Sequence, residues 1–230
     1  LVTSAGPQEG KSTTVINLGI IFAQGGNRVL LVDSDLRRPR LHKAFNVHRD
    51  LGLTNLVMNE SSAEDVIIET QVPNLFLIPC GPIPPNPSEM LGSSRMDEII
   101  VDLQSRFDIV LFDSPPIVAV TDAVVLSKKV DGVVLIAKAG KTTSEMMARA
   151  KRQLQDVNTH ILGTVLNDFN LRGEGYRYYY YYHYYRSEDG EKTRRRVRKK
   201  STSPQSVLAK TIAGMKQKKD GSGSDSDKTE

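Results

Sequence analysis

Short runs of apolar and β-branched residues recur along the chain, and within most of them the apolar residues are continuous and do not alternate with polar ones. Continuous runs of this kind are typical of strands that are buried on both faces of a parallel sheet. A first apolar run opens the chain. We expect further buried strands at residues 28–33, 75–79, 108–113, 132–137 and 160–167.

Longer stretches with helical spacing separate these runs. The spacing predicts helices over residues 10–26, 88–107 and 143–157, the last as a surface helix with one apolar face. Alternating strands and helices predict an α/β fold with a mainly parallel sheet flanked by helices. The 230 residues suffice for one substantial domain and a tail.

The pattern ends near residue 170. We therefore predict a folded domain over residues 1–170, a tyrosine-rich segment over 171–186 and a disordered tail over 187–230, because the tail's composition cannot bury enough apolar surface to offset its chain entropy. All eight tyrosines of the chain lie in the middle segment, at Tyr176, Tyr178, Tyr179, Tyr180, Tyr181, Tyr182, Tyr184 and Tyr185.

Charge divides along the same boundary. Residues 1–186 carry 19 Lys and Arg against 20 Asp and Glu, net −1, whereas residues 187–230 carry 12 against 7, net +5. The chain's net charge of +4 therefore belongs to the tail and gives the domain no reason to bind nucleic acid, so no nucleic-acid partner is expected. The basic run at 194–200 leaves three interpretations open: contact with anionic lipid head groups, contact with nucleic acid, or a solvated tail.

The single cysteine, Cys80, excludes an internal disulfide and fits a reducing, cytosolic compartment, where we expect it in the core. No window is apolar over a length that could span a membrane, and no signal peptide opens the sequence. The chain begins with Leu1 inside an apolar run, so we expect a soluble fragment, and a membrane segment upstream of it is left open.

The stretch SAGPQEGKST, from residue 4 to 13, follows the first apolar run and opens a helix. It matches the phosphate-binding P-loop pattern with Ala5 in place of the leading glycine, which makes the predicted α/β fold one of the P-loop NTPase type. Such a loop presents backbone N–H groups and the positive end of a helix to phosphates. Lys11 would reach the β- and γ-phosphates, and the Ser12 hydroxyl would ligate Mg²⁺. The nucleotide site is predicted to comprise Gly6, Pro7, Gln8, Glu9, Gly10, Lys11, Ser12 and Thr13.

Three acids follow buried runs. Asp113 ends the run at 108–113, where a Walker B carboxylate holds Mg²⁺, while Asp33 and Asp35 follow another run and face the same side of an extended chain. The carboxyl ends of parallel strands meet at one crevice, so these acids are expected to converge on the P-loop. Carboxylates beside phosphates repel them unless a cation intervenes, which predicts Mg²⁺ as well as ATP.

The P-loop, the LLVDSDLRRPR stretch, VLFDSPP and the tyrosine cluster together resemble the bacterial tyrosine kinases, P-loop enzymes with an additional acidic strand motif. The resemblance covers about residues 1–186. It implies that Lys11 and the loop backbone hold ATP, that Ser12, Asp35 and Asp113 hold Mg²⁺, and that Asp33 is the catalytic base for an incoming tyrosine. Asn167 is similar to the residue that recognises adenine in related ATPases.

The resemblance also implies that the eight tyrosines are phosphoacceptors, and that the cluster of one subunit enters its neighbour's site in a ring that autophosphorylation disperses. An aromatic adhesive segment is the alternative for this run. Further implied partners are a membrane chain-length-determinant protein of exopolysaccharide or capsule export, fused upstream or separate, and a cognate phosphotyrosine phosphatase. The implied location is the cytoplasmic face of the plasma membrane.

Two departures limit the resemblance. The acidic and arginine-rich oligomerisation helix that precedes the domain in the family is absent from this sequence, and the chain continues about forty residues past the cluster. Two other functions remain open. A partition or septum-positioning switch ATPase would use Asp33 to position water, but such proteins commonly carry a second lysine early in the P-loop, and no lysine precedes Lys11 here. A catalytically silent nucleotide-binding module would not need all three acids.

Overall fold

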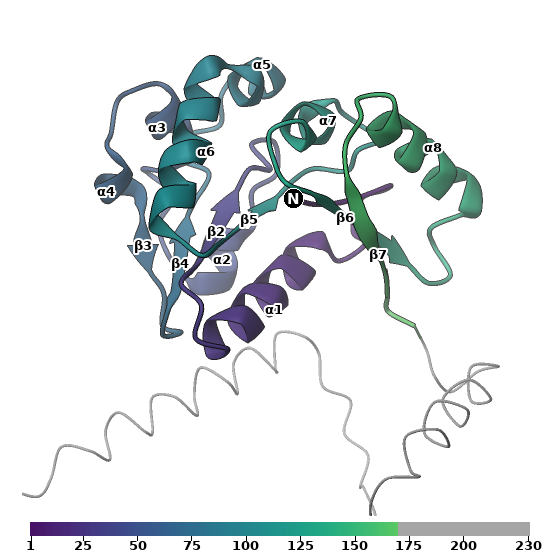
Figure 1. Cartoon of the computed structure of the whole chain (residues 1–230), viewed down its shortest axis with the longest axis horizontal. Helices are drawn as coiled ribbons and strands as arrows, with labels where there is room; N and C mark the ends of the chain where they lie inside the picture. The colour runs from purple at the N-terminus through teal and green to yellow at the C-terminus, as the bar shows by residue number, and fades with distance from the viewer. Residues whose placement is uncertain (170–230) are drawn as a thin grey trace, which may run out of the picture. The chain divides into compact units, whose positions relative to one another are not determined.

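The computed structural model describes residues 1–169, which form a central seven-stranded sheet with helices on both faces (Figure 1). The strand order is β3-β4-β2-β5-β1-β6-β7, and every pairing is parallel except that of the edge strand β3 with β4. The strands are β1 (Val2–Ser4), β2 (Val29–Asp33), β3 (Ile68–Glu69), β4 (Leu75–Ile78), β5 (Ile109–Asp113), β6 (Val133–Lys138) and β7 (Ile161–Asn167).

The expected strands and the mainly parallel sheet are confirmed, but the expected burial of the strand at residues 160–167 was wrong. That strand is β7, at the edge of the sheet, where Leu162 and Leu166 are 62% and 56% exposed. Every residue of β2 is buried, as its continuous apolar run predicts for a strand covered on both faces. The sequence did not predict β3, because two residues are too short for any periodicity. The predictions for residues 171–186 and 187–230 concern segments outside the described residues, so the domain boundaries stay predictions.

Figure 1 shows α1 on one face of the sheet and α6, α7 and α8 on the other. The helices are α1 (Lys11–Gln24), α2 (Leu41–Phe45), α3 (Leu53–Val57), α4 (Ala63–Val66), α5 (Pro87–Gly92), α6 (Ser94–Arg106), α7 (Asp122–Ser127) and α8 (Ser144–Gln155). The long helices α1 and α8 were predicted. The short helices α2, α3, α4 and α7 were not, because one turn gives little hydrophobic period.

The prediction of one continuous helix over residues 88–107 was wrong. Ser93 separates α5 from α6, with an extended backbone (φ −65°, ψ 156°) and a hydroxyl that accepts a hydrogen bond from the Met96 N–H. A serine in this conformation caps a helix N-terminus and satisfies a backbone donor that the first turn leaves free. The apolar spacing continues across the break, which is why periodicity alone hid it.

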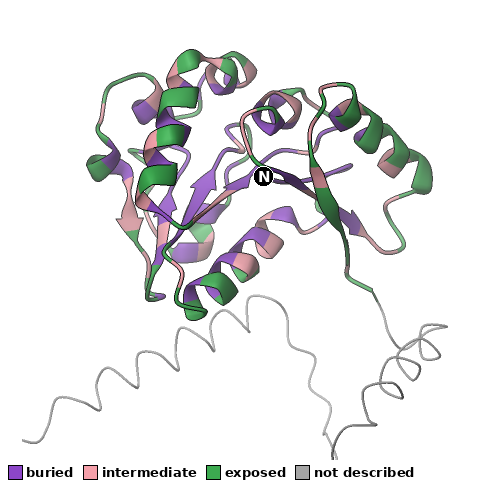
Figure 2. Ribbon diagram, viewed as in Figure 1, coloured by how far each residue is buried: buried purple, intermediate pink, exposed green. Residues whose placement is uncertain are grey.

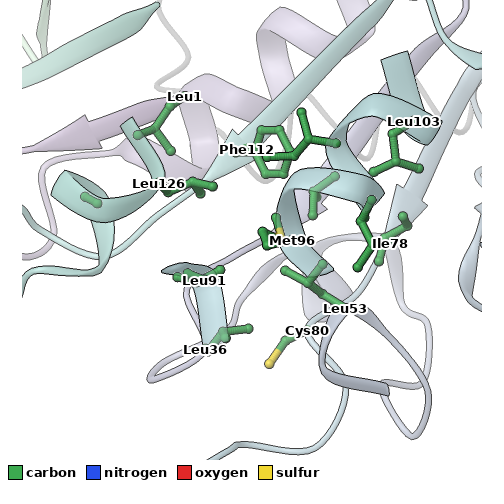
Figure 3. Packing of buried hydrophobic residues seen from close by; sticks show 14 of the residues in the cluster. Leu1, Leu36, Leu53, Ile78, Cys80, Leu91, Met96, Leu103, Phe112 and Leu126 are labelled. Atoms are coloured by element: carbon green, nitrogen blue, oxygen red, sulfur yellow. The ribbon is translucent and has the colours of Figure 1, made fainter. Parts of the chain in front are cut away.

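The main apolar core lies between the sheet and the helices α6, α7 and α8 (Figures 2 and 3). Met96 and Leu103 of α6 pack there with Phe112 of β5, and Leu126 of α7 joins them. Cys80 is fully buried in the same cluster, which confirms its expected core position. Within residues 1–169 no helix has the length and apolar character needed to cross a bilayer.

This topology brings the candidate residues together at the carboxyl ends of the parallel strands. Because β1, β2, β5, β6 and β7 run parallel, their carboxyl ends point the same way. The P-loop follows β1, Asp33 and Asp113 end β2 and β5, and Asn167 ends β7.

Candidate active site

The loop between β1 and α1 has the backbone of a phosphate cradle. The Gly6 N–H donates to Glu9 Oε2 at 2.9 Å, which closes the loop on itself, and the Ser4 hydroxyl donates to the Gly6 carbonyl at 2.6 Å. Gln8 and Gly10 have positive φ, 60° and 100°. Alternating backbone conformations of this kind turn successive N–H groups toward one point, where an anion can bind.

Three side chains from later segments of the chain donate hydrogen bonds to oxygen atoms of this loop. Lys141 Nζ donates to the Pro7 carbonyl, the Thr142 hydroxyl donates to the buried Glu9 carboxylate, and Asn167 Nδ2 donates to the Glu9 carbonyl at 3.0 Å. Each of these three bonds engages an oxygen atom of the loop and uses none of its N–H groups. The loop shape therefore depends on the β6–α8 connection and on the end of β7.

Gly10 lies where no larger residue fits. A Cβ atom built on Gly10 would lie 2.0 Å from Asn167 Nδ2, and its φ of +100° disfavours other residues even without the contact. Because Gly10 has no Cβ atom, the Asn167 side chain can lie close enough to donate its hydrogen bond to the Glu9 carbonyl. The sequence predicted Gly10 as part of the nucleotide site, and the structure gives a reason why this position is a glycine.

Lys11 is buried to 8% exposure at the first residue of α1. Burial lowers the pKa of its ammonium group, while the carboxylates of Asp113, Asp35 and Glu9 act in the opposite direction. These carboxylates stabilise the charged form of the Lys11 ammonium group, which can then bind an anionic ligand. The neighbouring Ser12 side chain hydrogen-bonds to Asp113, as a residue that shares a cation with that acid should.

Asp33 and Asp113 lie side by side, paired in register at the ends of β2 and β5. Asp33 Oδ2 accepts hydrogen bonds from the Arg40 and Leu41 N–H groups at 3.0 and 2.9 Å, whereas Oδ1 of each acid is buried without a partner. Burial, followed by repulsion from Asp113, raises the pKa of Asp33 to about 8. Burial raises the pKa of Asp113 to about 7, against the lowering effects of Ser12 and Lys11.

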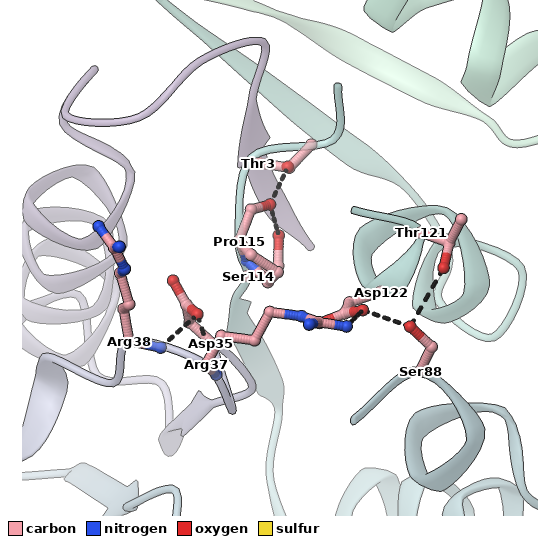
Figure 4. A network of polar contacts seen from close by, with 9 residues as sticks. All are labelled: Thr3, Asp35, Arg37, Arg38, Ser88, Ser114, Pro115, Thr121 and Asp122. Carbon is pink, nitrogen blue, oxygen red and sulfur yellow. Dashed lines mark hydrogen bonds and ion pairs between the residues drawn. The ribbon is translucent and has the colours of Figure 1, made fainter. Parts of the chain in front are cut away.

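Asp35 lies in the loop after β2, and its Oδ1 accepts from the Arg38 N–H at 2.9 Å (Figure 4). The following Arg37 extends across to α7, where its guanidinium binds the buried Asp122 carboxylate through Nε at 2.7 Å and Nη2 at 3.0 Å. The hydroxyls of Ser88 and Thr121 complete this network, with Ser88 donating to Asp122. The conformation of the Asp35 loop is therefore tied to α5 and α7.

The residues present fit a magnesium ion. Two buried carboxylate oxygens, one each from Asp33 and Asp113, lack a hydrogen-bond partner, and a buried charge without a partner is costly unless a cation or proton satisfies it. Among the described residues no three acidic, histidine or cysteine side chains form a complete cage for a metal ion. Mg²⁺ usually takes one or two carboxylates together with substrate phosphates and water, so the carboxylates present are sufficient in number for it.

The structure places the predicted residues of the domain at the carboxyl ends of the parallel strands. Pro7 and Gln8 form the exposed tip of the loop, Thr13 lies in the first turn of α1, and Lys11 interacts electrostatically with Asp35 and Asp113. Asn167 contacts the P-loop backbone, and its role toward adenine stays a prediction. The tyrosine cluster lies outside the described residues.

Sequence reasoning missed Lys141, Thr142, Ser88 and Asp122 as supports of the site. These polar residues lie far along the chain from the motifs, and no spacing rule connects them to the P-loop or to Asp35. The one available signal was the polar KAGKT stretch directly after a buried strand, at the edge where the motifs meet.

Comparison with known proteins places this arrangement in a family. The AAA domain family matches residues 8–161. The tyrosine-protein kinase YwqD of Bacillus subtilis is 44% identical over 167 residues, which are 73% of this chain and 70% of that protein. The tyrosine-protein kinase ptk of Acinetobacter johnsonii is 38% identical over 178 residues, 76% of this chain but 24% of that longer protein.

Solved structures agree. The kinase domain of Escherichia coli tyrosine kinase ETK superposes with a TM-score of 0.73 at 31% identity, covering 75% of this chain and 68% of that one. The septum site-determining protein MinD of Pyrococcus horikoshii, complexed with Mg-ADP, has a TM-score of 0.64 at 22% identity over 75% of this chain and 70% of its own, a likeness of fold alone. The chain belongs to the bacterial tyrosine-protein kinase family.

Proposed function

We propose that this chain is a protein tyrosine autokinase that transfers phosphate from ATP, with Mg²⁺, to the tyrosines of residues 176–185. The observation that carries the proposal is the convergence of Lys11, Ser12 and the three acids at the carboxyl ends of the parallel strands, beside the P-loop. Kinship with named tyrosine kinases supports the choice of acceptor.

Each residue has a defined task in this proposal. The P-loop N–H groups and Lys11 bind the phosphates of ATP and hold the γ-phosphoryl group in place, since phosphoryl transfer depends mainly on positioning and charge neutralisation. Ser12, Asp35 and Asp113 hold Mg²⁺, which supplies positive charge to the phosphate oxygens. The Asn167 Nδ2 group donates to the Glu9 carbonyl of the loop, and the side-chain oxygen of Asn167 would accept a hydrogen bond from the amino group of adenine.

Asp33 is the proposed base. Its Oδ2 is fixed by two backbone N–H groups, so the unpartnered Oδ1 is the atom that would accept the proton of a tyrosine hydroxyl. Burial that raises the pKa of this carboxyl to about 8 makes its ionised form a stronger base than an exposed aspartate. The tyrosine oxygen then bonds to phosphorus while the bond to the ADP oxygen breaks.

The cellular setting is part of the proposal. Kinases of this family with larger chains, such as the Acinetobacter protein, support a membrane chain-length-determinant partner that is fused upstream or separate, with regulation of exopolysaccharide export at the cytoplasmic membrane face. Self-association and a cognate phosphotyrosine phosphatase complete the proposed cycle. A switch ATPase is the second candidate, favoured by the fold it shares with the septum-positioning protein.

The test is mass spectrometry of the purified full chain after incubation with Mg²⁺ and ATP, beside Lys11→Met. Phosphate on several of residues 176–185 in the parent chain alone is expected. ADP release without phosphotyrosine would favour the switch ATPase, and full activity of Lys11→Met would contradict the assigned phosphate site. If neither phosphotyrosine nor ADP is formed, the reaction is repeated with the cytoplasmic tail of a chain-length-determinant protein. If no phosphotyrosine is formed there either, the kinase function is refuted.

A further inference from the structure

The Glu9 carboxylate is a charged group that is fully buried within the P-loop. Its Oε2 accepts a hydrogen bond from the Gly6 N–H at 2.9 Å, and its Oε1 accepts one from the Thr142 hydroxyl at 2.5 Å. A buried carboxylate is costly unless hydrogen bonds or a cation satisfy it. Gly6 belongs to the loop itself, so Thr142 is the donor through which a later segment of the chain holds this carboxylate.

The Thr142 hydroxyl is fixed by the end of strand β6. Its oxygen accepts from the Lys138 N–H at 2.8 Å, and the Thr142 N–H donates back to the Lys138 carbonyl at 2.9 Å, which closes a turn after the strand. Because a backbone N–H already donates to this hydroxyl oxygen, the hydroxyl hydrogen is directed toward Glu9. The sheet therefore sets the orientation of the donor that the Glu9 carboxylate receives.

Helix α8 begins directly after this turn and packs on the same part of the P-loop. Thr143 caps the helix, with its hydroxyl oxygen accepting from the Met146 N–H at 3.2 Å. A Cβ atom built on Gly6 would lie 3.0 Å from Met146 Cε and 3.0 Å from Glu9 Oε1, so both side chains approach the loop backbone closely. The bond between Thr142 and Glu9 is thus part of a packed junction between α8 and the P-loop.

We propose that Thr142 is a positioning residue for the nucleotide, which acts through Glu9 to hold the P-loop in the shape that binds the phosphates of ADP and ATP. The inference rests on the nucleotide site of the proposed function. The backbone N–H groups of a P-loop surround the α- and β-phosphates, which the two nucleotides share. The Glu9 charge also stabilises the ammonium form of Lys11. Thr142 should therefore set the affinity for both nucleotides and leave the transfer step unaffected.

The test is isothermal titration calorimetry of the full chain with Mg·ADP and with a non-hydrolysable ATP analogue. Thr142→Val keeps the shape of the side chain but removes the donor to Glu9 Oε1. The Kd for both nucleotides should rise at least about fivefold, because a hydrogen bond to a charged acceptor is lost. Thr142→Ser keeps the hydroxyl and should remain within about twofold of the parent chain. The rate of phosphate transfer at saturating ATP should also remain within about twofold in Thr142→Val.

A double-mutant cycle tests whether the effect passes through Glu9. Glu9→Met removes both carboxylate acceptors, so adding Thr142→Val to that variant should change the Kd by less than about twofold. The matched control is Thr159→Val, which removes the hydroxyl that lies 2.7 Å from the Ser127 hydroxyl, beyond the other end of α8. This control should leave the affinity for both nucleotides unchanged.

An unchanged Kd in Thr142→Val would overturn the proposal. A loss of affinity that Thr142→Ser shares, or one that persists in full in the Glu9→Met chain, would overturn it as well. So would a lower rate at saturating ATP with unchanged affinity, because Thr142 would then act on the transfer step. A parent chain that does not bind Mg·ADP would instead contradict the nucleotide site on which this inference and the proposed function both rest.

Discussion

The guanidinium of Arg37 and the carboxylate of Asp122 form a two-hydrogen-bond ion pair that joins the loop after β2 to the start of α7. The Asp122 side chain has no exposed surface, whereas the Arg37 side chain is 41% exposed. The arginine therefore supplies the charge that a buried carboxylate requires. Since Asp35 lies two residues before Arg37, the same pair fixes the loop that is proposed to hold magnesium.

Arg37→Gln should lower the free energy of unfolding by roughly 1–3 kcal/mol, because it leaves a buried carboxylate without its cation. Chemical denaturation with urea measures the change. Arg95→Gln is the matched control, since the Arg95 side chain is similarly exposed, 38%, but its partner Glu98 is 65% exposed. The control should cost less than about 1 kcal/mol, as exposed pairs do. Equal losses in the two variants would show that burial of Asp122 does not matter.

Much of the fold and the motif residues could be predicted from the sequence, because both depend on local patterns. The apolar run at 29–33 requires burial on both faces, and the parallel topology that follows brings Asp33 beside Asp113. The P-loop spacing likewise placed Lys11 and Ser12. In each case a short stretch of sequence determines the local structure. These stretches then come together because the carboxyl ends of parallel strands lie at the same end of the sheet.

The supports of the site could not be predicted, because they are contacts between distant segments. Thr142 reaches Glu9 across 133 positions, and Arg37 reaches Asp122 across 85. Nothing in either local pattern indicates its partner. The break at Ser93 was missed for the opposite reason: the local cap was present, but the helical period on both sides concealed it.

Gly10→Ala should impair nucleotide binding more than it destabilises the fold. The new methyl group would collide with the Asn167 amide, 2.0 Å from its nitrogen, and displace the hydrogen bond that holds the Glu9 carbonyl. We expect an increase in the Kd for ATP of at least about tenfold, equivalent to about 1.4 kcal/mol. Isothermal titration calorimetry measures the affinity, and thermal unfolding measures the stability.

Gly26→Ala is the control that separates two effects of the Gly10 substitution: the backbone cost of alanine at a positive φ, and the collision with Asn167. Gly26 has a similar φ of +94°, but no atom lies within 4 Å of the position that a new methyl group would take, so this variant reports the backbone cost alone. That cost should be about 1 kcal/mol in stability, without any change in ATP affinity. If Gly10→Ala binds ATP as well as the Gly26 variant does, the contact with Asn167 has no part in shaping the loop.

Cys80 should be unreactive in the native protein. Its side chain is fully buried, and burial raises the pKa of the thiol to about 12, so the reactive thiolate is scarce at neutral pH. Reaction with a thiol-specific disulfide reagent should follow the opening of the core and accelerate greatly in denaturant. Rapid stoichiometric labelling of the folded chain would show that the core around Cys80 opens without global unfolding.

Magnesium-free protein should lose stability as pH rises through the neutral range. In the folded state the pKa of Asp33 is raised to about 8 and that of Asp113 to about 7, from an ordinary value of 3.8. Between these values the folded state binds more protons than the unfolded state, so the free energy of unfolding falls with increasing pH. The contribution is fully present below about pH 4 and is lost as the pH rises through the folded pKa values of about 7 and about 8, and we expect it to reach roughly 2–5 kcal/mol.

Asp33→Asn isolates this contribution, because an amide oxygen can still accept from the Arg40 and Leu41 N–H groups but does not titrate. The variant should be more stable than the parent chain at pH 8 and should show a smaller decline from pH 5 to 8 in urea titrations. Magnesium with ATP should reduce the decline in the parent chain, since a cation stabilises the ionised carboxylates. A parallel decline in both chains would show that Asp33 is already ionised throughout this range and that its burial is compensated in another way.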